Sequence, residues 1–539
     1  MNVPLRKPEK VLSLGHMGVM QPSRLSFLRQ LMRDLARFEA SITRPVWDVN
    51  EQGHGHAVYT VTLGGYAYSL IAFSQHLADE DRSDRVIATA WDAAFVLFDG
   101  VPDDADITRL KENVPHQEAG RLTAQELVLS RANKSVRLFT HVVEALRNGR
   151  QPERDQIADC GYLMRTTAVY GNGKFGLADR TAYDQRPGLS GPFAAEMLTV
   201  WLIRGFTHDL AEHLGGAEID RNIKRFLGVG NATGLGMAPF LVSHPQLLHA
   251  WFHARETAIS AVLSKPTVTA GEADTLLARG AEAAAYLASW EVADEDAMDE
   301  IRDLRREWDD FFTPLTRDGL CADGGLKRAF ARAQQGSPAL EELAAAWILE
   351  PFDHSVELST EGMATQLDLA LDGAMTCAEL RALIEEKCAW ALEPDFDCKS
   401  TTAQFWYVSE EKLEPRLGAR HEEPGADRES PLDTARAMQS LHAALPDDAE
   451  PCFTFLARAP EHRAIARRIQ HLARHDYGEI RANLIGEEAA PIHLLRAKLS
   501  FFGATRFDPK SKLWTRVTLA QGLPLRDEIG HDVPWLPSL

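Results

Sequence analysis

Gly171-Asn172-Gly173-Lys174-Phe175-Gly176 and Gly228-Val229-Gly230-Asn231-Ala232-Thr233-Gly234-Leu235-Gly236 flank one long apolar segment, Phe193 to Leu214. Pro192 precedes this segment and Gly215-Gly216 follow it, which are the positions where proline begins a helix and glycine ends one. The pattern therefore predicts a helix over 193–214 between two Gly-rich turns. Glycines this dense beside an apolar helix usually allow the backbone to approach another helix or a ligand closely.

Polar side chains of the predicted helix fall into two groups on a helical wheel. Arg204, His208 and Glu212 lie together away from the apolar arc. Side chains at this spacing interact along a helix face, so we expect charge pairs at the surface or between helices.

The second group, Glu196, Asp209 and His213, falls in or beside the apolar arc, where a charge is costly unless it is paired. Asp209 and His213 are one helical turn apart, so a carboxylate there can orient the imidazole and raise its basicity. We predict Asp209 and His213 as a catalytic pair and Glu196 as a second acid/base candidate. The alternative is structural, because the helix dipole favours an acid in the first turn and a histidine in the last.

The two Gly-rich turns predict an anion site. Consecutive backbone N–H groups in such a turn, with a lysine and an arginine nearby, can hold a carboxylate, sulfonate or phosphate. We expect Arg165, Asn172 and Lys174 to bind the anion, and Asn231 and Thr233 to fix its orientation. Lys174 is not followed by Ser or Thr, so the turn is not a Walker loop. Close packing of helices would also explain the glycines.

A metal site is the first alternative. His249, His253 and Glu256 lie on one stripe of a helix and can bind zinc or iron. The His-Glu-x-x-His motif of zinc proteases is absent. No cofactor is identified by the sequence.

The clearest β pattern lies near the start of the chain. Runs 57–63 and 66–73 are rich in β-branched and aromatic residues and flank Gly64-Gly65, which predicts a hairpin. The run 85–98 fits a third strand or a helix, and from Ile107 the periodicity is helical. We expect a long polar loop over 413–433.

These patterns predict a mainly α protein with minor β: a multi-helix core, a small N-terminal β-hairpin or sheet, and a short C-terminal β portion. We expect an N-terminal α+β region at 1–106, a central helical domain at 107–349 that contains the Gly-rich turns, and a mixed region at 350–539.

Composition limits the function. The 539 residues are 45% hydrophobic and 25% charged, which is typical of a soluble globular protein. The net charge of −20 argues against nucleic acid and anionic membranes as partners. The first residues lack the apolar run of an export signal, and no stretch is apolar enough to span a membrane, so we expect a cytoplasmic protein. Its oligomeric state stays open.

The sequence therefore predicts a cytoplasmic enzyme that binds an anionic small metabolite between the two Gly-rich turns. Acid/base chemistry of the lyase, isomerase or transferase type fits its candidate residues. Two alternatives remain, a metal-dependent enzyme and a non-catalytic helical scaffold whose glycines serve close packing.

Overall fold

The computed structural model describes most of the chain. The described residues are 3–76, 91–113, 123–171, 186–191, 193–231, 245–292, 294–352, 371–392, 405–409, 412–418, 426–428, 432–446, 448–474, 491–511, 514–537 and 539.

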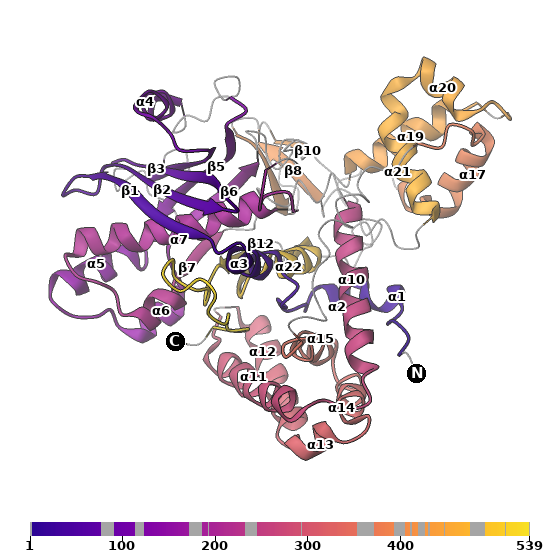
Figure 1. The fold of residues 1–539 in the computed structure, drawn as a ribbon. Coiled ribbons are helices and arrows are strands. Elements are labelled where there is room, and N and C mark those ends of the chain that lie inside the picture. The colour runs from indigo at the N-terminus through magenta and orange to yellow at the C-terminus, as the bar shows by residue number, and fades with distance from the viewer. Residues whose placement is uncertain are drawn as a thin grey trace.

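A nine-stranded mixed sheet forms the centre of the molecule (Figure 1). Its strands, in spatial order, are β1 (Ser41–Val49), β2 (Gly55–Leu63), β3 (Tyr66–Ser74), β4 (Ala93–Asp99), β5 (Glu126–Lys134), β6 (Tyr162–Gly171), β7 (Gly228–Asn231), β12 (Trp514–Leu519) and β11 (Arg506–Ser511). Neighbouring strands are antiparallel except β6 and β7, which run parallel. The sheet therefore joins residues from both ends of the chain.

Helices surround this sheet. Those described are α1 (Pro8–Val11), α2 (Leu14–Met17), α3 (Phe27–Arg37), α4 (Asp104–Asn113), α5 (Phe139–Arg147), α6 (Arg154–Cys160), α7 (Ala194–Gly215), α8 (Arg221–Phe226), α10 (Pro245–Leu263), α11 (Ala270–Ser289), α12 (Glu295–Phe312), α13 (Arg317–Cys321), α14 (Gly325–Ala333), α15 (Pro338–Trp347), α17 (Cys377–Lys387), α18 (Ala389–Leu392), α19 (Leu432–Ala444), α20 (Cys452–Arg458), η3 (Pro460–His462), α21 (Arg463–Arg474) and α22 (Pro491–Phe502).

The predicted fold class was wrong, because the sheet is large and central. The predicted hairpin region does form β2 and β3, which pair across Gly64-Gly65, but they are only two of the nine strands. The region expected to be helical after Ile107 contains β5. Part of the second Gly-rich turn is strand β7. Strand pairing brings together distant segments, and a local periodicity cannot show such partners.

Side chains of the sheet alternate between two apolar layers. Ile71 and Val96 face one side and pack with Leu110 of α4. Leu70 and Phe95 face the other side, which belongs to the main core together with α7. Figure 1 shows α7 along one face of the sheet and α4 on the opposite face. The sheet is thus covered on both faces, which explains why so many of its strand residues are apolar.

Helix α7 is close to its prediction. It begins after Phe193, which adopts a left-handed φ of 57°, and it ends at Gly216, whose φ is 72°. Glycine takes this conformation without strain and commonly ends helices. The helix is buried along most of its length, so most of the polar residues predicted on it are buried as well.

A second, smaller core lies within α17 to α21. It contains Leu380, Ile384 and Ile469, and it is separate from the core beside the sheet. A three-stranded sheet of β8 (Phe405–Ser409), β9 (Lys412–Gly418) and β10 (Ala426–Arg428) lies between these helices in sequence. The loop predicted over 413–433 was wrong in part, because β10 and most of β9 fall within it.

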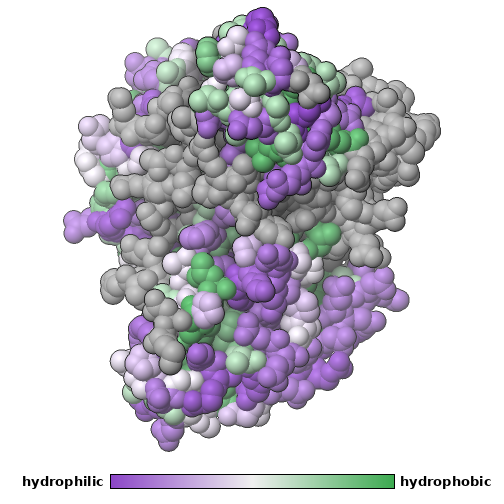
Figure 2. Space-filling model, turned by 90° about the vertical axis from the view of Figure 1, so that its right-hand side faces the viewer, coloured by the Kyte–Doolittle hydropathy of each residue, from purple (hydrophilic) through white to green (hydrophobic). Residues whose placement is uncertain are grey.

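No helix in the described part of the chain is long and apolar enough to cross a membrane. On the face shown in Figure 2, hydrophilic residues predominate among those described, and hydrophobic ones form small groups. Monomeric proteins usually expose their apolar residues in this scattered way.

Candidate functional site

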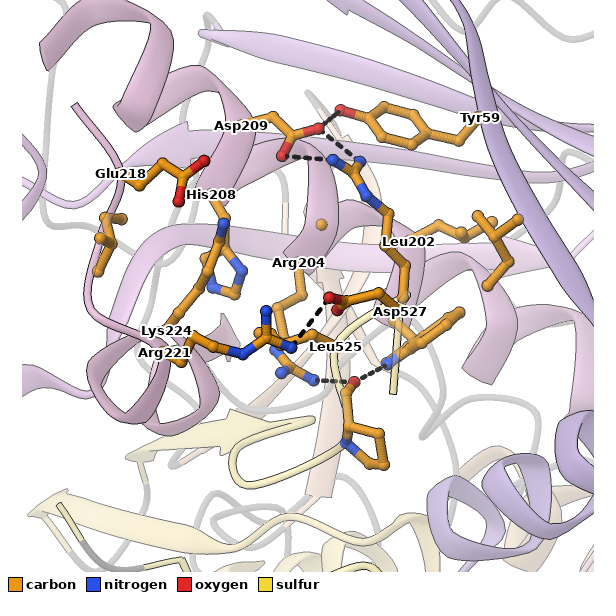
Figure 3. A pocket seen from close by; sticks show the side chains of 16 residues that line it. Tyr59, Leu202, Arg204, His208, Asp209, Glu218, Arg221, Lys224, Leu525 and Asp527 are labelled. Atoms are coloured by element: carbon orange, nitrogen blue, oxygen red, sulfur yellow. Dashed lines mark hydrogen bonds and ion pairs between the residues drawn. The ribbon is translucent and has the colours of Figure 1, made fainter. Parts of the chain in front are cut away.

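The candidate site is a cleft of about 260 Å³ beside the middle of α7 (Figure 3). Ile42 of β1 and Tyr59 of β2 line one side, α7 forms the floor, and α8 with the preceding loop lines another side. The C-terminal segment 523–528 completes the wall. We refer to this space as the α7 cleft.

Arg204 of α7 lies at the bottom of the cleft and is only 1% exposed. Its Nη2 donates to the Leu523 carbonyl at 2.6 Å and its Nη1 to the Pro524 carbonyl at 3.4 Å. Within the described residues, its Nε–H has no hydrogen-bond partner and its guanidinium forms no ion pair with a carboxylate. Burial lowers the pKa of Arg204 to about 9, so the group is still charged at neutral pH. The nearby Glu528 charge offsets only part of this burial. A buried cation without a direct carboxylate contact is costly, and an anionic ligand would stabilise it.

His208 lies one helical turn after Arg204 and is 2% exposed. Its Nε2 lies 3.1 Å from the Leu227 carbonyl, which can only accept a hydrogen bond. The proton therefore sits on Nε2, and Nδ1 keeps a free lone pair in the neutral form. Burial, followed by the charges of Arg204 and Lys224, holds the pKa of His208 well below its usual value. His208 is thus a neutral imidazole with a fixed tautomer.

Asp209 holds two walls of the cleft together. It is 6% exposed, and its Oδ2 accepts hydrogen bonds from Arg44 at 2.6 Å, Arg526 at 2.6 Å and Tyr59 at 2.8 Å. Burial and the Asp209 charge hold the pKa of Tyr59 well above its usual value, so the phenol stays a donor. Asp209 therefore joins β1, β2 and α7 to the C-terminal segment.

On the opposite side of the cleft, Glu528 connects the C-terminal segment to α8. Its carboxylate accepts hydrogen bonds from Arg225 at 2.6 Å and from Arg221, and it is 3% exposed. Lys224 of α8 pairs with Glu212 of α7 at 2.7 Å. This last contact confirms the charge pair between helices that the α7 stripe predicted. The other two stripe residues are buried in the cleft.

The structure places the predicted catalytic residues as follows. Asp209 directs its carboxylate to the two arginines and the tyrosine, whereas His213 is exposed, accepts from Trp47 at 3.4 Å and contacts the Asn50 carbonyl at 2.8 Å. No hydrogen bond joins Asp209 to His213 in the described part of the chain. Glu196 is buried in the first turn of α7, roughly 20 Å along the helix axis from Asp209. These three residues do not form one group.

Part of the predicted anion site is described. Arg165 of β6 and Asn231 of β7 are 5% and 1% exposed, and the parallel pairing puts Thr166 beside Asn231. Arg165 and Asn231 are therefore brought onto neighbouring strands. The other three predicted residues, Asn172, Lys174 and Thr233, lie outside the described residues.

The metal alternative has no described ligand set. Among the described residues, no group of three or more His, Cys, Asp or Glu side chains can hold a metal ion. The Glu256 carboxylate accepts hydrogen bonds from Nη2 and Nε of Arg6, at 2.6 and 2.7 Å. His253 is exposed, and His249 is half-buried.

The sequence did indicate that Arg204 and His208 would be buried, but the helical-wheel analysis did not take this into account. A helix that is apolar over nearly its whole circumference is expected to be buried on all sides. Its few polar residues must then be buried too, including a stripe that faces away from the main apolar arc.

No protein-family model, curated protein or solved structure matches this chain.

Proposed function

We propose that the protein binds a small metabolite in the α7 cleft through an anionic group. The observation that supports this most strongly is Arg204, a buried guanidinium with no carboxylate partner in the described structure and an unused Nε–H. Charge-assisted hydrogen bonds from arginine are among the strongest polar contacts in ligand recognition. A space of about 260 Å³ fits a metabolite of few atoms.

A thermal-shift experiment tests this proposal. The wild-type protein is melted in acetate, glycolate, succinate and inorganic phosphate at equal ionic strength. A ligand at 100 times its Kd adds about 2.7 kcal/mol of stability, which is easily measured. We expect at least one anion to raise the melting temperature of the wild type but not of Arg204→Met.

Two further variants make this experiment decisive. If Arg204→Met does not fold by circular dichroism, Arg204→Gln, which removes the charge but keeps a polar side chain at the same position, replaces it. Lys174→Ala tests the site predicted at the Gly-rich turns, whose support is the parallel pairing of β6 and β7. The proposal fails if no anion stabilises the protein, or if the folded Arg204 variant responds like the wild type.

Acid/base catalysis is the second candidate function, and His208 favours it. A neutral imidazole that donates from Nε2 to a buried carbonyl can accept a proton at Nδ1 from a bound ligand. His208→Gln should keep ligand binding and lose turnover if the protein is an enzyme. The cytoplasmic location and the lack of nucleic-acid partners belong to the same proposal, supported by the net charge of −20.

A further inference from the structure

We infer that the ligand of the α7 cleft is zwitterionic, an amino acid or a similarly small molecule with one carboxylate and one protonated amine. This inference rests on the proposed function. It concerns the second charge of the ligand, which the buried arginine alone does not define.

The cations of the cleft leave room for only one anionic group. Arg526 is paired with Asp209, Lys224 with Glu212, and Arg221 with both Asp527 and Glu528. Arg204 is the one lining cation in the described residues that has no carboxylate partner. A ligand with two anionic groups would therefore leave the second one without an available cation.

One lining carboxylate is available for a cation. Asp209 and Asp527 are occupied by arginines, but the Glu218 carboxylate has no ion pair or hydrogen bond with any described residue. Glu218 lies in the loop between α7 and α8. Figure 3 shows its carboxylate directed toward His208, while Arg204 lies farther down the cleft.

Within each ion pair of the cleft, the positive and negative charges neutralise each other. Among the described lining residues, one positive group, Arg204, and one negative group, Glu218, then remain without an ion-pair partner. A neutral ligand that carries both charges completes both ends at once. The carboxylate would bind Arg204 and the ammonium group would bind Glu218, with His208 between them. Purely anionic ligands would satisfy only the first contact.

Matched ligands test the inference by isothermal titration calorimetry. Each amino acid of a panel (alanine, serine, leucine and aspartate) is compared with the carboxylic acid that lacks its amine, and with its carboxamide. We expect the best amino acid to bind about two- to fivefold more tightly than its deaminated acid, because an ion pair with the exposed Glu218 contributes up to about 1 kcal/mol. The carboxamide should bind weakly as well.

Variants assign the two ends. Glu218→Gln should remove the preference for the amine and leave binding of the deaminated acid unchanged. Glu51→Gln, an exposed position in the β1–β2 turn outside the cleft, is the control with the same change of charge and should bind like the wild type. Arg204→Met should weaken both members of each pair.

The outcomes separate the two proposals. If an acid binds as tightly as its amino acid, or if Glu218→Gln keeps the preference for the amine, the zwitterion inference is overturned while the anion site stands. If neither series binds, or if Arg204→Met binds both as the wild type does, the proposed function fails as well.

Discussion

Gly230 shows that a glycine of the second Gly-rich turn has a packing role. A Cβ on Gly230 would lie 2.6 Å from the Tyr162 ring, which is closer than side chains allow. We expect Gly230→Ala to lower the free energy of unfolding by about 1–3 kcal/mol, because the tyrosine must shift in a tight core. Urea unfolding measures the change.

Gly271, in the first turn of α11, provides the control for this substitution. Apart from the neighbouring residues and backbone of its own helix, nothing lies within 4 Å of a Cβ built at this position. Gly271→Ala should therefore leave stability unchanged or raise it slightly, since alanine is the better helix former. A Gly230→Ala protein as stable as the wild type would show that this glycine is not required for packing.

Glu528 gives a pH dependence at the scale of one residue. Burial alone would raise its pKa, but hydrogen bonds from Arg225, from the Leu525 N–H and from Arg221 outweigh burial and lower the pKa to about 2. The ion pairs therefore stabilise the fold fully above the pKa of the unfolded chain, about 4.3. Their contribution is lost as the pH falls from there toward 2.

Glu528→Gln tests this dependence. We expect the wild type to lose stability more steeply than the variant between about pH 4.5 and 2, because the amide does not titrate. Unfolding free energies measured across this range give the two slopes. Parallel curves would contradict the role assigned to Glu528.

At the scale of elements, a cluster of buried ion pairs connects the N-terminal segment to α10 and α15. Arg6, 7% exposed at its side chain, pairs with Glu256 at 2.6 Å and with Glu342 at 2.7 Å. Removing one partner of a buried pair leaves an uncompensated charge. We expect Arg6→Met to cost about 3–5 kcal/mol in thermal or denaturant unfolding.

Lys7 is the matched control, since it is adjacent and exposed. Lys7→Met changes the net charge equally and should change stability little. Equal losses in both variants would mean that net charge, and not the buried cluster, determines the effect.

Elements also show what the sequence could predict. The apolar run between Pro192 and Gly215-Gly216 gave α7 within one residue at each end. Strand β5 was assigned to a helix, because its polar residues follow no alternation and it is paired on both sides. Strand β7 was assigned to a turn, because its glycines are set by contacts with distant residues.

In the candidate site, too, local sequence predicts some features, whereas contacts between distant segments determine others. Asp209 and Arg526 meet only because the C-terminal segment returns to α7, 317 residues later in the chain. No local pattern predicts that contact. The apolar character of α7 was sufficient to predict that Arg204 and His208 are buried. It was not sufficient to predict which residues surround them.

At the scale of the whole molecule, the two separate cores predict two unfolding units. Ile384 belongs to the small core of α17 to α21, and Leu276 of α11 belongs to the core beside the sheet. Each is fully buried, so alanine at either position should cost about 2–5 kcal/mol. We expect each loss to appear only in its own unit.

Hydrogen exchange followed by mass spectrometry measures the two units separately. Ile384→Ala should speed exchange in α17 to α21 and leave α7 protected, and Leu276→Ala should do the reverse. If either variant deprotects both units equally, the two cores unfold together.

The anion site in the α7 cleft is tested most directly by calorimetric titration of the best-binding carboxylate into three proteins. These are the wild type, Arg204→Met and Arg328→Gln, the last an exposed arginine of α14 outside the cleft. We expect one site in the wild type, unchanged binding in Arg328→Gln, and binding at least about tenfold weaker in Arg204→Met. Equal binding in all three proteins would contradict the site.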